Sequence, residues 1–139
     1  MAYQKFRVRS PVKSFRDLEV YQEATKLSAE IFGLKPPKKY QDDNDVKSEL
    51  NILKEMSKIT PKLIVESYGD KFTDFDLADR KLEKSAYTIN MIMAKLDFLN
   101  ALVNSEEFRE QNSAILKRYQ RTKWRIINLK RAWAKVFKR

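Results

Sequence analysis

Apolar residues recur every three or four positions along most of the chain, which is the period of an amphipathic α-helix. The first such segment predicts a helix that begins near Ser14, because Ser14 and Asp17 have the spacing of a capping box. Gly33 suits the end of this helix, and the proline pair at 36–37 forbids its continuation. The buried face is predicted to consist of Val20, Ala24, Leu27 and Ile31.

A second helix is predicted from about Asp45 to Tyr68, between a polar loop at 41–45 and Gly69. Two apolar stripes run along it, and both have helical spacing. One stripe consists of Val46, Leu50, Leu53 and Ile64. The other consists of Ile52, Met56, Ile59 and Leu63.

A third helix is predicted to begin at a capping box formed by Thr73 and Asp76 and to reach Val103. Its main apolar face consists of Ala78, Leu82, Ile89, Ile92, Leu96, Leu99 and Val103. A second stripe lies nearly opposite and consists of Tyr87, Met91, Ala94, Phe98 and Leu102. A surface helix of a monomeric bundle needs only one apolar stripe, so the second stripe predicts a subunit interface. The alternative is a central helix within the monomer.

A fourth helix is predicted to start at Glu106 and Glu107, whose charges suit the positive end of the helix dipole, and to run almost to residue 139. Its buried face consists of Ile115, Tyr119, Thr122, Ile126, Leu129, Trp133 and either Val136 or Phe137. Four helices with short loops and no strand pattern predict an all-α, antiparallel up-down four-helix bundle over residues 14–139. Residues 1–13 are predicted to form a basic, flexible arm.

The amino-acid composition excludes several classes of function. The chain has no histidine and no cysteine, which excludes the usual zinc sites, disulfides and Ser-His or Cys-His catalysis. It has two glycines and no glycine cluster, so a P-loop or dinucleotide fingerprint is absent. No apolar run is long enough to cross a bilayer, and no signal peptide is visible. We therefore expect a cytoplasmic protein that is not an enzyme and has no catalytic residue, no metal, no cofactor and no membrane partner.

Two groups of aspartates could form magnesium sites of a metal-dependent nuclease. One group consists of Asp42, Asp43 and Asp45, and the other of Asp74, Asp76 and Asp79. Both groups fall at predicted helix starts, where carboxylates accept hydrogen bonds from free backbone N–H groups. Capping is therefore the preferred interpretation.

Positive charge is concentrated at the end of the sequence. The formal net charge is +10, and residues 111–139 contain ten Lys or Arg and no Asp or Glu. On a helical wheel these cations lie opposite the apolar face or along its borders. Such a localised excess predicts phosphate contacts with RNA or DNA. The candidate ligands are Lys117, Arg118, Arg121, Lys123, Arg125, Lys130, Arg131 and Lys135, with Arg7, Arg9 and Lys13 on the arm.

Trp124 lies in the middle of this basic face, where an isolated surface helix would not place an aromatic residue. It could stack on a nucleobase, which makes it a further candidate for nucleic-acid binding. It could equally anchor a contact with another protein, because tryptophan is common at interfaces. Both interpretations stay open. Basic amphipathic helices also bind membranes or calmodulin, but here the apolar face is needed for the bundle core.

Two segments of the sequence resemble a known family. Residues 15–22 read F-R-D-L-E-V-Y-Q, which resembles the F-R-D-L-x-V-W-Q opening of four-helix-bundle proteins encoded in intervening sequences of 23S ribosomal RNA genes. Residues 59–69 are similar to that family's P-x-N-I-A-E-G-x-G motif. The matching positions are Pro61, Ile64, Glu66 and Gly69, and the differing positions are Leu63, Val65 and Ser67. The resemblance covers roughly residues 14–103 and leaves out the basic last helix.

The superfamily also includes the accessory variability determinant of diversity-generating retroelements. The resemblance to that protein implies a basic, pentameric four-helix bundle that binds a reverse transcriptase and associates with nucleic acid. The degraded second motif and the positive charge favour this type over the plain intervening-sequence type. The expected function is thus a non-enzymatic, homo-oligomeric, nucleic-acid-binding accessory protein of a reverse transcriptase. The alternative is an intervening-sequence-type bundle that acts as a protein-interaction scaffold.

Overall fold

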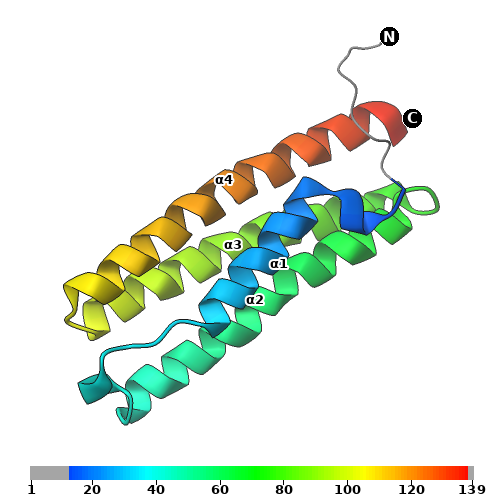
Figure 1. The fold of residues 1–139 in the computed structure, drawn as a ribbon. Coiled ribbons are helices and arrows are strands. Elements are labelled where there is room, and N and C mark those ends of the chain that lie inside the picture. The colour runs from blue at the N-terminus through cyan, green and yellow to red at the C-terminus, as the bar shows by residue number, and fades with distance from the viewer. Residues whose placement is uncertain (1–12, 138–139) are drawn as a thin grey trace.

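Four long helices run alternately up and down a common axis (Figure 1). They are seen in a computed structural model that describes residues 13–137. The elements are η1 (Phe15–Asp17), α1 (Glu19–Phe32), η2 (Lys38–Tyr40), α2 (Asn44–Asp70), α3 (Phe75–Leu102) and α4 (Glu106–Phe137), where η marks a short 3₁₀ turn. No strand occurs within the described range. The predicted all-α, four-helix fold is therefore confirmed for these residues.

The core lies between the helices and follows the predicted faces closely. All four predicted core residues of α1 are buried, as are all seven on the main face of α3. Tyr119 and Phe108 of α4 are the largest of the fully enclosed side chains. Each fully buried large apolar side chain favours the folded state by roughly 1.5–3 kcal/mol. α1 is the shortest of the four helices and packs on both α2 and α4.

The predicted capping box at Ser14 and Asp17 is present, but it caps the start of η1 instead of the start of α1. The Ser14 hydroxyl accepts a hydrogen bond from the Arg16 N–H at 3.2 Å, and the Asp17 carboxylate accepts one from the Ser14 N–H at 3.3 Å. Leu18 then adopts an extended backbone, with φ −75° and ψ 124°, and is buried in the core. α1 therefore starts at Glu19, because burial of Leu18 requires this break in the helix.

Acidic side chains cap two further helices. Asp43 accepts hydrogen bonds from the N–H groups of Asp45 and Val46 at the start of α2. Asp74 accepts one from the Leu77 N–H at 3.1 Å and caps α3. Capping is thus confirmed for these two aspartates. The predicted box at Thr73 is wrong, because the Thr73 hydroxyl donates to the carbonyl of Asp70 instead.

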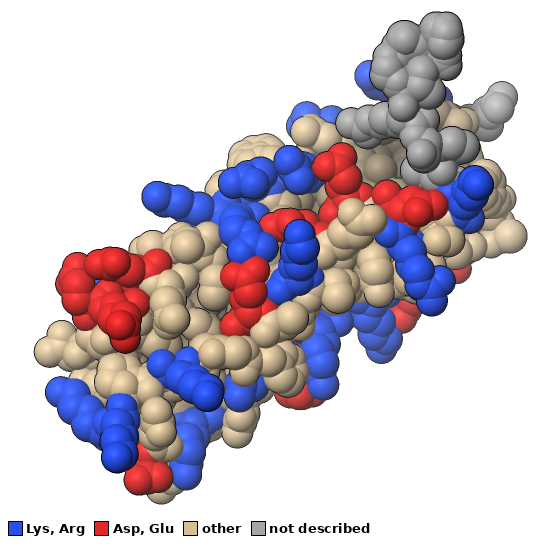
Figure 2. Space-filling view, viewed as in Figure 1, with Lys and Arg blue, Asp and Glu red and all other residues tan. Residues whose placement is uncertain are grey.

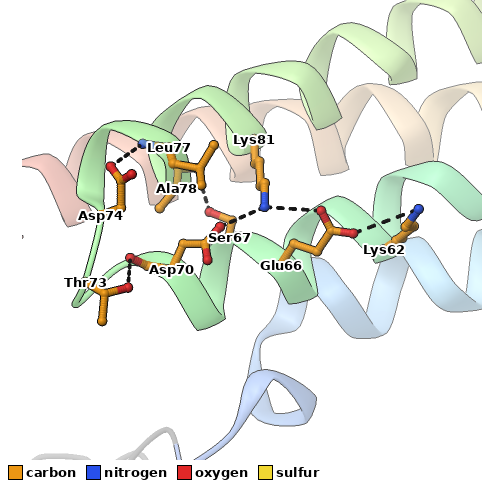
Figure 3. A network of polar contacts seen from close by, with 9 residues as sticks. All are labelled: Lys62, Glu66, Ser67, Asp70, Thr73, Asp74, Leu77, Ala78 and Lys81. Atoms are coloured by element: carbon orange, nitrogen blue, oxygen red, sulfur yellow. Dashed lines mark hydrogen bonds and ion pairs between the residues drawn. The ribbon is translucent and has the colours of Figure 1, made fainter.

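The turn between α2 and α3 is held by a network of polar contacts (Figure 3). The Ser67 hydroxyl donates to the Ala78 carbonyl at 2.7 Å across the two helices. The Lys81 ammonium contacts the carboxylates of Asp70 at 2.8 Å and Glu66 at 3.3 Å. The pKa of Lys81 is raised, mainly by its hydrogen bond to Asp70. These contacts fix where α3 starts relative to α2. No helix in the described part is long and apolar enough to cross a membrane.

Candidate nucleic-acid interface

The helix α4 begins acidic and becomes strongly basic. Its first turn contains Glu106 and Glu107, whereas all its charged residues from position 111 onward are Lys or Arg. Figure 2 shows Lys and Arg gathered over the surface along which α4 runs, with acidic residues gathered at its start. Because the opposite face of α4 is buried in the core, the folded bundle presents these cations on a rigid support.

Three of the predicted phosphate ligands are paired with carboxylates of neighbouring helices. Arg118 contacts Glu23 at 3.0 Å and also contacts Glu30, both on α1. The hydrogen bond to Glu30 is the main cause that raises the pKa of Arg118. Two looser pairs continue the pattern along the borders of α4. They are Arg125 with Glu19 of α1 at 3.8 Å and Lys130 with Asp79 of α3 at 3.3 Å.

These paired cations lie on the two borders of α4, where it meets α1 and α3. A carboxylate already bound to a guanidinium or ammonium competes with a phosphate for the same hydrogen-bond donors. We therefore assign the border cations mainly to holding α4 against its neighbours. The sequence could not separate them from the others, because their partners come from distant parts of the chain.

Four other cations share the solvent-facing side of α4 and are called the cationic row. The row consists of Lys117, Arg121, Arg131 and Lys135, all exposed. In the described part of the chain, no carboxylate lies within ion-pair distance of any of them. At 1.5 Å per residue the row extends along about 27 Å of helix, which is the length spanned by about eight phosphates of one DNA strand. Lys123 also has no carboxylate partner within residues 13–137, and it lies half-buried on the border that faces α3.

Trp124 lies within the cationic row, as the wheel predicts. Its side chain is 52% exposed, and the Lys123 ammonium lies 5.7 Å from the centre of its ring. A half-exposed indole contributes less hydrophobic stabilisation than a buried one and leaves part of its ring free to contact a ligand or another protein. Of the predicted arm ligands, Arg7 and Arg9 lie outside the described residues. Lys13 is exposed, and its backbone N–H donates to Asp17.

A groove of about 370 Å³ lies between α3 and α4, beside the cationic row. Its lining includes Tyr87 of α3 together with Lys123 and Arg131 of α4. The helical period places Tyr87 in the second stripe of α3 and does not predict this groove. The only signal in the sequence was that Tyr87 is the polar end of an otherwise apolar stripe.

The rest of the second stripe faces away from the core. Met91, Ala94 and Phe98 of α3 join Ile52 and Met56 of α2 along a groove of about 400 Å³. Met91 and Phe98 are about half exposed, while the remaining stripe residue, Leu102, packs against the core. α3 is therefore not buried on both sides within one chain. We call Ile52, Met56, Met91, Ala94 and Phe98 the apolar stripe.

No family model, curated protein or solved structure matches this chain. The family resemblance therefore rests on the two sequence motifs alone, and the structure gives both a local role. In the first motif, the Gln22 amide donates to the Arg16 carbonyl at 2.7 Å, and the rings of Phe15 and Tyr21 meet edge to face. In the second motif, Glu66 belongs to the α2–α3 network. Neither motif contributes to the cationic row.

The aspartates weighed as magnesium ligands have other partners or lie apart. Asp43 and Asp74 cap helices, and Asp79 pairs with Lys130. Within residues 13–137 no cluster of three or more His, Cys, Asp or Glu side chains is arranged to hold a metal ion.

Proposed function

We propose that this protein binds RNA or DNA through phosphate contacts along α4, without reading base sequence. The observation that supports the proposal is the cationic row, four exposed cations on one face of a helix, none of which has a carboxylate partner within residues 13–137. Unpaired cations at fixed spacing sum their potentials, and each phosphate contact releases a condensed counterion. Arg121 and Arg131 add bidentate hydrogen bonding to this attraction.

The proposal includes assembly into a homo-oligomer. The apolar stripe is the proposed interface, because contiguous apolar surface on a soluble domain usually marks an interaction site. The Lys95 and Glu49 side chains pair at 2.6 Å beside the stripe and supply part of a polar rim. In a ring of subunits the cationic rows would act together, which raises the affinity for a long nucleic acid. The pentameric number comes from the family resemblance alone.

By the same resemblance, we propose that the protein acts as a non-enzymatic accessory of a reverse transcriptase of the diversity-generating retroelement type. The strong positive charge of α4 supports this reading over the plain intervening-sequence type. Copurification with a reverse transcriptase encoded beside the gene, as a complex of defined mass, is the expected result. Migration of the two purified proteins as separate species would contradict this part of the proposal.

The phosphate mechanism is tested by replacing all four residues of the cationic row with Gln. A control variant replaces four exposed lysines elsewhere, Lys26, Lys35, Lys47 and Lys84, and has the same net charge. Affinity for a labelled single-stranded oligonucleotide is measured by fluorescence anisotropy across a salt series. Loss of the row should weaken binding at least about tenfold and reduce the log–log salt slope by about three.

The control variant should keep most of its affinity and its salt slope. Equal weakening of both variants would show that net charge, and not the row, carries the binding. Wild-type affinity that stays flat from low to high salt would contradict the phosphate mechanism altogether.

The alternative function, a protein-interaction scaffold, is favoured by the half-exposed Trp124. In that case α4 engages an acidic protein and Trp124 anchors the contact. Trp124→Ala should then abolish binding of the protein partner and leave salt-dependent oligonucleotide binding nearly unchanged. Calorimetric titration of the variant with each ligand in turn separates the two functions.

A further inference from the structure

The groove between α3 and α4 combines a floor formed by core residues with a basic rim and an exposed aromatic ring. Its floor is apolar and includes Leu82 and Ile126, both buried. Its rim includes the cations Lys123, Lys130 and Arg131 and also the carboxylate of Glu83. Lys130 is paired with Asp79, whereas Lys123 and Arg131 have no carboxylate partner among the described residues. The Tyr87 ring also lines the groove and is 64% exposed. The volume of about 370 Å³ falls within the range of small-ligand sites.

The helix register places Tyr87 close to Lys123. Asp79 and Lys130 face each other at 3.3 Å across the two antiparallel helices. Eight residues beyond Asp79 on α3 is Tyr87, and eight residues before Lys130 on α4 is Thr122. Because both helices rise by the same amount per residue, Tyr87 is level with Thr122, the residue before Lys123. The exposed Tyr87 ring and the Lys123 side chain therefore line the same groove at about the same level.

The combination of Tyr87 and Lys123 in one groove suits a single nucleotide that is not base-paired. A nucleobase can stack on the Tyr87 ring and cover the apolar floor, while its phosphate contacts the Lys123 ammonium. Asn90 also lines the groove and can donate or accept a hydrogen bond at a base edge. In a duplex the faces of the bases are covered by stacking, so a duplex can contact the cationic row but cannot fill the groove.

We propose that the groove between α3 and α4 binds a single unpaired nucleotide, with its base against Tyr87 and its phosphate at Lys123, so that the protein prefers single strands to duplexes. This inference rests on the proposed phosphate binding along α4 and adds a site to it. Lys123 connects the two surfaces, because it lines the groove and also lies 5.7 Å from the Trp124 ring in the row.

The test compares a labelled oligodeoxythymidine strand with a duplex of the same length, at one salt concentration. The full chain should bind the single strand at least about tenfold more tightly than the duplex. Tyr87→Ala should weaken single-strand binding by roughly 5- to 100-fold, the usual effect of losing one stacked base, and leave duplex binding unchanged. Tyr87→Phe keeps the ring and should stay within about twofold of wild type.

Because Tyr87 adjoins Met91 on α3, the solution mass of each variant is measured first. If Tyr87→Ala alters the mass, Lys123→Gln replaces it in the same comparison and should again weaken only the single-strand complex. Photo-crosslinking with a strand containing 4-thiothymidine locates the base directly, and mass spectrometry should find the adduct between residues 82 and 90.

The outcomes separate the two proposals. Binding of neither strand nor duplex would overturn both the phosphate mechanism and the groove. Equal, salt-dependent binding of strand and duplex, with no selective effect of Tyr87→Ala, would overturn the groove alone. A crosslink found only at Trp124 would also overturn the groove, since the base would then lie on the cationic row.

Discussion

At the scale of single residues, Lys71 is a cation buried among aromatic rings. It is only 7% exposed, and no carboxylate within residues 13–137 pairs with it. Its ammonium lies 3.3 Å from the centre of the Tyr68 ring and 4.2 Å from that of Phe72, and it donates to the Tyr68 carbonyl. Ring faces stabilise a cation, but burial still lowers the pKa of Lys71 below the usual lysine value.

This lowered pKa predicts a pH dependence of stability. In the window just below pH 10.5, the folded chain binds fewer protons at Lys71 than the unfolded chain does. The free energy of unfolding contributed by Lys71 therefore rises with pH through that window. Urea denaturation at several pH values should show wild type gaining stability relative to Lys71→Met as the pH approaches about 10. The exposed Lys84, replaced in the same way, should show no such trend. A constant difference between wild type and Lys71→Met would contradict the assigned burial.

At the scale of elements, the helical period predicted the buried face of α1, the main face of α3 and most of the buried face of α4, whereas for α2 it gave two stripes, one of which contains the exposed Ile52 and Ile59. Val20, Leu27 and their partners on α1 are buried because core positions repeat with the helix turn. The period could not show that Leu18 would interrupt the first helix, because that depends on space in the core. It also could not show that Arg118 pairs with carboxylates of α1, whereas Arg121 has no carboxylate partner within residues 13–137. The partners of both residues are decided by helix packing, and wheel positions contain no such information.

The start of α3 offers a test at this scale, because the sequence and the structure name different capping residues. Asp74→Ala should lower the free energy of unfolding by about 1 kcal/mol, since the N–H of Leu77 loses its acceptor. Thr73→Ala should change it by less than about 0.5 kcal/mol. Asp74→Asn retains a capping oxygen and serves as the control. Chemical denaturation followed by circular dichroism measures all three variants. A larger loss of unfolding free energy for Thr73→Ala than for Asp74→Ala would support the capping box predicted from the sequence at Thr73.

At the scale of the whole molecule, the two proposed binding surfaces lie on different sides of α3. The groove with Tyr87 faces α4, and the apolar stripe with Met91 faces α2. Nucleic-acid binding and subunit contact therefore need not compete for the same residues. This arrangement could not be deduced from the sequence, where Tyr87 and Met91 are one helical turn apart and look like members of one stripe.

A mass measurement tests the proposed assembly. Sedimentation of the wild-type chain should give a multiple of the 16.5 kDa subunit mass. The double substitution Met91→Ser and Phe98→Ser should shift it toward the subunit mass while helicity is retained, because both side chains are about half exposed in one chain. Phe32→Ser removes an equally exposed aromatic residue outside the stripe and should leave the mass unchanged. A wild-type chain that sediments as a monomer would contradict the oligomer.

The short helix α1 has a consequence for local unfolding. Its 14 residues are attached to α4 through carboxylates at Glu23 and Glu30, whereas α2 and α3 meet along much longer apolar faces. Ion pairs near the surface weaken as salt screens them, but apolar contacts do not. The backbone amides of α1 should thus exchange with deuterium earlier than those of α3, and added salt should widen that gap. Exchange followed by mass spectrometry measures this order, and equal protection of α1 and α3 at all salt concentrations would refute it. The conditions that release a bound strand would then also loosen the first helix, so strand release and opening of the bundle would be driven by the same change in ionic strength.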